Sequence, residues 1–172
     1  MKTLPAKLDV AANVCTIAVC IIVAFVLVNR LIADRSTPAA SGPPPLYAQG
    51  ERMEALPGVN YAASSKTLVM FVRSTCVFCT ESMPFYQRLA SESKRRQGSF
   101  QLVAVGVETP DTIDTYLRAH DVIVDQVVSI QSGTTRLIAT PVLLLIDSSR
   151  KVIQQWAGKL PAAKEQELLH AL

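Results

Sequence analysis

The sequence predicts an α/β domain, a central sheet flanked by helices, preceded by an apolar N-terminal segment and a Pro-rich linker. Two observations predict this organisation. Short apolar runs alternate with longer amphipathic runs from about residue 59 onward, which is typical of a sheet with crossover helices. One uncharged apolar run near the start is long enough to cross a bilayer. We expect four consecutive parts: a short tail at 1–9, a transmembrane anchor at 10–33, a Pro/Ala/Ser-rich linker at 34–58 and the α/β domain at 59–172.

The apolar run VAANVCTIAVCIIVAFVLV occupies residues 10–28. As a helix it would rise roughly 28 Å, close to the thickness of the hydrocarbon layer. A cleaved signal peptide usually has an apolar core of about 7–15 residues and an uncharged approach to its cleavage site, whereas Arg30, Asp34 and Arg35 follow this run. We therefore favour an uncleaved anchor, and the small residues Ala39-Ala40 leave a cleaved signal as the alternative. The two flanks carry almost equal positive charge and do not decide the orientation.

The composition excludes two broad classes of protein. The chain of 172 residues is 49% hydrophobic, which is too apolar for an intrinsically disordered protein. Its formal net charge is +3, and the only basic run is Lys94-Arg95-Arg96. Because nucleic-acid-binding domains usually carry a clustered basic face, we expect no nucleic-acid partner. The segment STPAASGPPPLYAQG, residues 36–50, has no helical or strand period and predicts an extended spacer.

The strands are predicted from apolar runs of β-prone residues. TLVMFV at 67–72 and FQLVAVGV at 100–107 are almost wholly apolar, so we expect strands buried on both faces. A weaker candidate follows at 127–130. VLLLID at 142–147 is a third strong run, and a Ser-Ser-Arg turn leads from it into 151–156.

The helices are predicted from amphipathic runs and their end signals. A helix is expected at 79–96, with basic residues in its last turn. Thr109 provides an N-cap for 109–120 and is followed by a proline and an acid, both favoured in a first turn. A short helical segment is expected at 133–139, and a closing helix at 161–172 begins with a proline.

The four cysteines form two pairs of different meaning. Cys15 and Cys20 lie in the apolar run, about 140° apart around a helix axis, and we interpret them as small apolar side chains. Cys76 and Cys79 form a C-x-x-C motif where a buried strand is expected to end and a helix to begin. At that place unpaired backbone N–H groups and the helix dipole favour a thiolate on Cys76. Cys79, one turn further, could then attack a mixed disulfide formed by Cys76.

Zinc binding and a structural disulfide are the competing interpretations of this motif. Zinc would need two more ligands, and the predicted domain has only His120 and His170. A disulfide across two intervening residues closes too small a loop to stabilise the fold much. We expect no metal and no other cofactor.

The segment TLVMFVRSTCVFCTESMP, residues 67–84, resembles the active-site strand and helix of the thioredoxin superfamily. Pro84 stands where thioredoxins carry the proline that kinks this helix. Thr140-Pro141 resembles their cis-proline loop, and Trp156-Ala157-Gly158 resembles their closing turn. The resemblance covers about residues 59–172 and implies a thioredoxin-like fold with a mixed sheet. The long spacing from Cys76 to Pro141 and the anchor resemble the membrane-tethered TlpA/ResA-like group.

The resemblance implies a membrane-tethered thiol-disulfide oxidoreductase that exchanges disulfides with protein cysteines. Its implied site is a nucleophile at Cys76, a resolving thiol at Cys79, and substrate-binding residues at Thr140, Pro141, Val77 and Phe78. The implied partners are cysteine-containing client proteins and a membrane thiol or electron donor. The implied location is the cytoplasmic membrane, crossed once, with the thioredoxin-like domain on the extracytoplasmic (periplasmic) side.

The sequence also departs from the family pattern. Thr75 replaces the tryptophan usual before the first cysteine, Met70 replaces a buried acid, and Ser82 replaces a glutamate common in the TlpA/ResA group. These departures support a second hypothesis, a non-enzymatic thioredoxin-like binding or chaperone module tethered to the membrane. They also leave the proton acceptor for the second thiol unassigned.

Three charged residues are candidate modulators of the dithiol. Glu81 and Glu108 could accept the Cys79 proton, although acids beside a helix start commonly serve only to compensate the dipole. Arg73 could lower the pKa of Cys76 by its charge, and it could equally be a solvated residue at a strand end.

Overall fold

The computed structural model describes residues 23, 47–96, 98–131 and 139–172. Apart from residue 23, the anchor predicted at 10–33 lies outside these residues, as do the linker up to residue 46 and the helix expected at 133–139 save its last residue. Within the described ranges, no helix has the length and apolar character needed to span a membrane.

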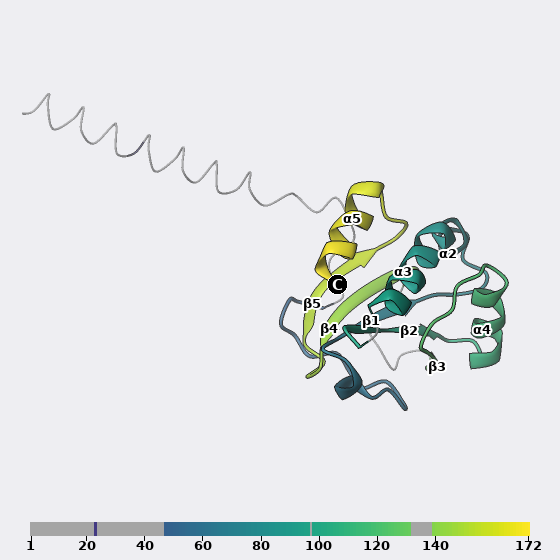
Figure 1. The fold of residues 1–172 in the computed structure, drawn as a ribbon, viewed down its shortest axis with the longest axis horizontal. Helices are drawn as coiled ribbons and strands as arrows, with labels where there is room; N and C mark the ends of the chain where they lie inside the picture. Colours follow the sequence, from purple (N-terminus) through teal and green to yellow (C-terminus); the bar gives the residue numbers. More distant parts are fainter. Residues whose placement is uncertain (1–22, 24–46, 97, 132–138) are drawn as a thin grey trace, which may run out of the picture. The chain divides into compact units, whose positions relative to one another are not determined.

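The described domain contains both helices and strands, as Figure 1 shows. In chain order the elements are η1 (Tyr61–Ala63), β1 (Lys66–Phe71), α2 (Val77–Glu81), α3 (Met83–Arg95), β2 (Phe100–Gly106), α4 (Pro110–Arg118), β3 (Gln126–Ser129), β4 (Val142–Asp147), β5 (Val152–Ala157) and α5 (Ala162–Ala171).

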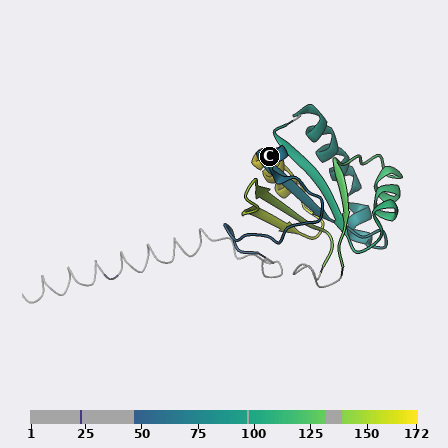
Figure 2. The ribbon, with the colours of Figure 1, turned by 90° about the horizontal axis from the view of Figure 1, so that it is seen from below.

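The strands form one mixed sheet in the order β3-β2-β1-β4-β5. β1 pairs in parallel with β2, and β2 with β3, whereas β4 runs antiparallel to both β1 and β5. Figure 2 shows these strands side by side from a second direction. The mixed sheet with its helices confirms the α/β prediction. The central strand β1 leads directly into the C-x-x-C motif.

The sheet separates two apolar cores, and alternate residues of β1 enter each of them. Leu68 and Met70 belong to the core that also contains residues of α3, α4 and α5. Val69 and Phe71 belong to the second core, on the other face of the strand. Strands buried on both faces explain why their sequences are apolar runs without polar alternation.

The predicted linker differs from the structure after residue 46. Tyr47, Met53 and Leu56 are at most 4% exposed and pack in the second core. The backbone of this segment pairs with the start of β5, where the Gly50 N–H donates to the Val152 carbonyl at 2.7 Å. The order of this segment therefore comes from long-range pairing, which leaves no local period in the sequence.

The helix predicted at 79–96 is two helices. α2 begins at Val77, directly after Cys76, and Ser82 ends it while also capping α3. Pro84 lies in the first turn of α3, where its missing N–H costs no hydrogen bond. Because of this break, α2 is a separate short helix with Cys76 at its N-cap and Cys79 within it.

Candidate active site

The loop between β1 and α2 is held by a carboxylate from the segment that follows β2. Glu108 Oε2 accepts a hydrogen bond from the Ser74 N–H at 2.9 Å, and Oε1 accepts one from Ser74 Oγ. The Cys76 N–H donates to the Arg73 carbonyl at 3.1 Å, which closes a turn just before the helix. These bonds fix the place at which the chain enters α2.

Cys76 is the N-cap of α2 and is partly exposed. Its Sγ accepts a hydrogen bond from the Cys79 N–H at 3.3 Å and lies 3.3 Å from the Thr140 carbonyl oxygen. Burial alone would raise the pKa of this thiol, but hydrogen bonds with the Thr140 side chain and with Cys79 lower the pKa below its ordinary value of 9.0. The Cys76 sulfur is therefore the one whose thiolate is stabilised.

Cys79 has the opposite environment. Its side chain is 0% exposed and packs in the helix-covered core. Burial, followed by the hydrogen bond with Cys76, raises its pKa to about 12. Both cysteines are free thiols in this structure. The arrangement can supply one reactive thiolate at the surface and one protected thiol directly behind it.

The Thr140–Pro141 loop faces the first sulfur. The peptide bond between these two residues is cis, and the Pro141 carbonyl accepts a hydrogen bond from the Gly158 N–H at 2.8 Å. The loop thus carries the Thr140 carbonyl to within hydrogen-bond distance of Cys76, although 64 residues separate them in the chain.

Val77 and Phe78, between the cysteines, are apolar and face solvent. They are 68% and 58% exposed and are the most exposed large apolar side chains of the described domain. Exposed apolar side chains next to a reactive group are typical of a surface that binds a partner.

The three predicted modulators lie in different surroundings. Glu81 forms an ion pair with Lys159 at 3.0 Å, and Glu108 is bound to Ser74. Arg73 is exposed near the start of the loop, two residues after β1, and is not among the main groups that lower the Cys76 pKa. Arg73 reaches the dithiol through its backbone, whose hydrogen bond to Cys79 partly offsets the raised pKa of that thiol. Within the described domain, the carboxylates of Glu81 and Glu108 bind Lys159 and Ser74 and not a cysteine side chain.

The histidines take no part in a metal centre within the described ranges. The His120 ring lies 2.9 Å through Nδ1 from the Tyr116 carbonyl oxygen, and His170 lies in the last turn of α5. No group of three or more His, Cys, Asp or Glu residues in these ranges is placed to hold a metal ion.

Two tyrosines near the dithiol were not anticipated from the sequence. The Tyr116 hydroxyl is 3.0 Å from Thr80 Oγ1, which joins α4 to α2. Tyr86 is 1% exposed, and burial together with the nearby charge of Cys79 raises its pKa. Both contacts join residues on separate helices, so no local motif could have indicated them.

Comparisons with known proteins agree with this geometry. No protein-family model and no curated protein matches the chain. Among solved structures, a thiol:disulfide interchange protein DsbE from Chlorobium tepidum is 26% identical, with a TM-score of 0.53, over 72% of this chain and 97% of that one. A thiol:disulfide interchange protein from Bacteroides sp. is 16% identical, with a TM-score of 0.57, over 74% and 91% of the two chains. A thiol-disulfide oxidoreductase from Bacteroides fragilis is 15% identical, with a TM-score of 0.54, over 73% and 100%.

The described domain has the fold of the thioredoxin superfamily, with a dithiol at the N-terminus of a helix. Its solved neighbours are named thiol:disulfide interchange proteins and thiol-disulfide oxidoreductases. Fold and paired thiols together are those of a thioredoxin-like thiol-disulfide oxidoreductase.

Proposed function

We propose that this chain is a membrane-tethered thiol-disulfide oxidoreductase that exchanges disulfides with client proteins through Cys76 and Cys79. The observation that carries the proposal is the contrast between the two sulfurs. Hydrogen bonds lower the pKa of the partly exposed Cys76, and burial raises the pKa of Cys79 to about 12. Disulfide exchange needs this contrast, because one thiolate must attack while the other stays protonated until a mixed disulfide has formed.

The reaction moves two electrons between the dithiol and the client. The Cys76 thiolate attacks one sulfur of a client disulfide, the client S–S bond breaks, and the departing client thiolate takes up a proton. Cys79 then loses its proton and attacks the Cys76 sulfur. The mixed disulfide breaks, a Cys76–Cys79 disulfide forms, and the second client thiolate is released and protonated. The same steps run in reverse when the oxidised protein accepts electrons from client thiols.

The surface around Cys76 supports a protein client. Val77 and Phe78 offer an apolar lip that a partner can cover, which excludes water from the attacked sulfur. Thr140 and Pro141 face the nucleophile and would align the client chain there.

The tether and its location rest on the sequence. The uncharged run within the predicted anchor at 10–33 supports a single membrane crossing. The extracytoplasmic side for the domain at 59–172 is supported by its resemblance to the TlpA/ResA-like group, because the charges beside the run do not decide the orientation. A dithiol protein in that position needs a source or sink of electrons, for which a membrane thiol or electron donor is the natural partner. Alkaline extraction of membranes tests the tether. We expect the chain in the pellet with its full mass, and a soluble product lacking the first residues would mean a cleaved signal.

Catalysed reduction of insulin by dithiothreitol tests the enzymatic proposal. The full-length protein should accelerate the reaction, Cys76→Ser should abolish the acceleration, and Lys94→Ser should retain it because Lys94 is exposed on α3. Cys79→Ser should accumulate a covalent adduct between Cys76 and the client, visible on a non-reducing gel. If the wild-type protein gives no acceleration and Cys79→Ser gives no adduct, the non-enzymatic binding or chaperone module replaces this proposal.

A further inference from the structure

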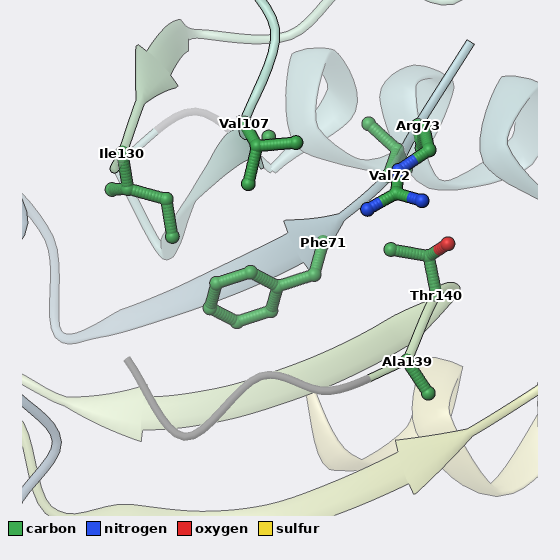
Figure 3. A pocket seen from close by; sticks show the side chains of 8 residues that line it. Phe71, Val72, Arg73, Val107, Ile130, Ala139 and Thr140 are labelled. Carbon is green, nitrogen blue, oxygen red and sulfur yellow. The ribbon is translucent and has the colours of Figure 1, made fainter. Parts of the chain in front are cut away.

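A cavity of about 170 Å³ lies beside the loop that carries the nucleophile. Figure 3 shows the Phe71 ring with Val107 and Ile130 on one side of it and Arg73 and Thr140 on the other. These residues come from the ends of β1 and β2, from the residue after β3 and from the loop before β4. The cavity thus lies at the end of the sheet where β1 leads into the cysteine motif.

One side of this cavity is apolar and incompletely covered. Phe71 is 2% exposed and Ile130 is 7% exposed, so both are firmly packed. Val107 is 44% exposed, which makes it one of the few large apolar side chains of the described domain that face solvent. Covering such a side chain with another apolar group is favourable, because it removes apolar surface from water.

The other side of the cavity carries one cation, the guanidinium of Arg73. Arg73 is the only charged residue among the described residues that line the cavity. It is exposed, and it forms no ion pair with any residue in the described ranges. A guanidinium in this position attracts a carboxylate and can bind it through two parallel hydrogen bonds.

The cavity shares a wall with the reactive site. Thr140 lines the cavity, and its carbonyl oxygen lies 3.3 Å from Cys76 Sγ. When a client cysteine reacts with Cys76, the client residues one or two positions from that cysteine therefore lie at the opening of the cavity. Because its walls are largely apolar and a nucleophile lies nearby, the cavity suits a client segment better than it suits a small free anion.

We propose that this cavity is a specificity subsite for the client, and that it binds an apolar side chain next to an acidic one beside the reactive client cysteine. Phe71 and Val107 receive the apolar side chain, and Arg73 pairs with the carboxylate. The proposal rests on the proposed disulfide exchange and names the class of client segment that this exchange prefers.

Peptide disulfides that differ only beside the cysteine test the subsite with the full-length chain. We compare kcat/KM for a peptide with Leu-Asp next to the cysteine, one with Leu-Lys and one with Ser-Asp. An exposed ion pair predicts a preference of roughly threefold for Leu-Asp over Leu-Lys, and burial of the leucine predicts about tenfold over Ser-Asp. Arg73→Glu should invert the Asp/Lys preference. Lys94→Glu makes the same charge change at an exposed site on α3 and should leave that preference unaltered.

A redox-independent measurement separates failure of the subsite from failure of the proposed function. The Leu-Asp peptide with serine in place of its cysteine should shift the NMR signals of the Val107 methyl groups and Arg73 Nε in Cys76→Ser protein. Exchange without peptide preference, or an Asp/Lys ratio unchanged by Arg73→Glu, overturns the subsite and leaves the oxidoreductase intact. Shifts at these two residues without any exchange support the subsite while overturning the enzymatic proposal. If neither disulfide exchange nor these NMR shifts are observed, the subsite and the enzymatic proposal are both overturned.

Discussion

Limited alkylation of the reduced protein should modify Cys76 long before Cys79. The pKa of Cys79 is raised to about 12, whereas that of Cys76 lies below 9.0. A gap of at least about 3 pKa units makes the thiolate fraction of Cys79 roughly 1,000-fold smaller at neutral pH. The Cys79 thiolate is the more basic of the two and therefore roughly 20-fold more nucleophilic, which offsets part of its lower abundance. Cys76 should therefore react at least about 50-fold faster than Cys79. The complete burial of Cys79 widens this difference further.

The assay is a short exposure of the reduced full-length chain to iodoacetamide at neutral pH, followed by acid quenching and peptide mapping by mass spectrometry. The map separates the two site cysteines from Cys15 and Cys20. Alkylation in denaturant is the control, because unfolding should bring the rates of Cys76 and Cys79 close together. Equal rates in the folded protein, or faster modification of Cys79, would refute the assignment of nucleophile and resolving thiol.

Three other perturbations follow from the same contacts. The reduced protein should lose stability as the pH rises above 9.0, because the Cys79 thiol ionises there in the unfolded chain but only at about 12 in the folded one. Denaturant titrations measure this, and the oxidised protein, whose disulfide does not titrate, should show a smaller decline that begins at higher pH, because only the tyrosines with raised pKa, such as Tyr86, contribute to it. Glu108→Gln weakens the acceptor of two Ser74 hydrogen bonds and should cost about 1 kcal/mol of stability, with an unchanged thermal midpoint counting against the role of this carboxylate. Gly106→Ala places a Cβ within 2.9 Å of the Val72 carbonyl oxygen. It should cost about 1–3 kcal/mol, and a variant as stable as wild type in urea would contradict that packing.

The strands were predictable because their sequences report burial directly. The run at 67–72 became β1 at Lys66–Phe71, and 142–147 became β4 at Val142–Asp147. Both strands lie inside the sheet and are covered on both faces, so almost every residue is apolar. The segment around Met53 was not predictable, because its order depends on pairing with a strand about 100 residues further along the chain.

The features of the site that depend on neighbouring residues in the sequence were predictable, and those that depend on tertiary packing were not. The place of Cys76 at a helix start follows from a strand ending just before a C-x-x-C motif. The bond between Glu108 and Ser74 spans 34 residues, and the contact between Tyr116 and Thr80 spans 36. Each depends on how β2 or α4 packs beside the active-site loop, so neither leaves a pattern in the sequence. The nearness of Thr140 came from the family resemblance and not from the residues themselves.

The reduction potential of the Cys76–Cys79 pair tests the central claim most directly. The full-length chain is equilibrated in glutathione and dithiothreitol buffers, quenched by alkylation, and mapped for free and paired thiols. We predict one reversible two-electron couple that links these two cysteines. A potential near roughly −270 mV would indicate a reductant and one near roughly −120 mV an oxidant of client proteins. Failure to form a reversible Cys76–Cys79 disulfide at any potential would contradict the account.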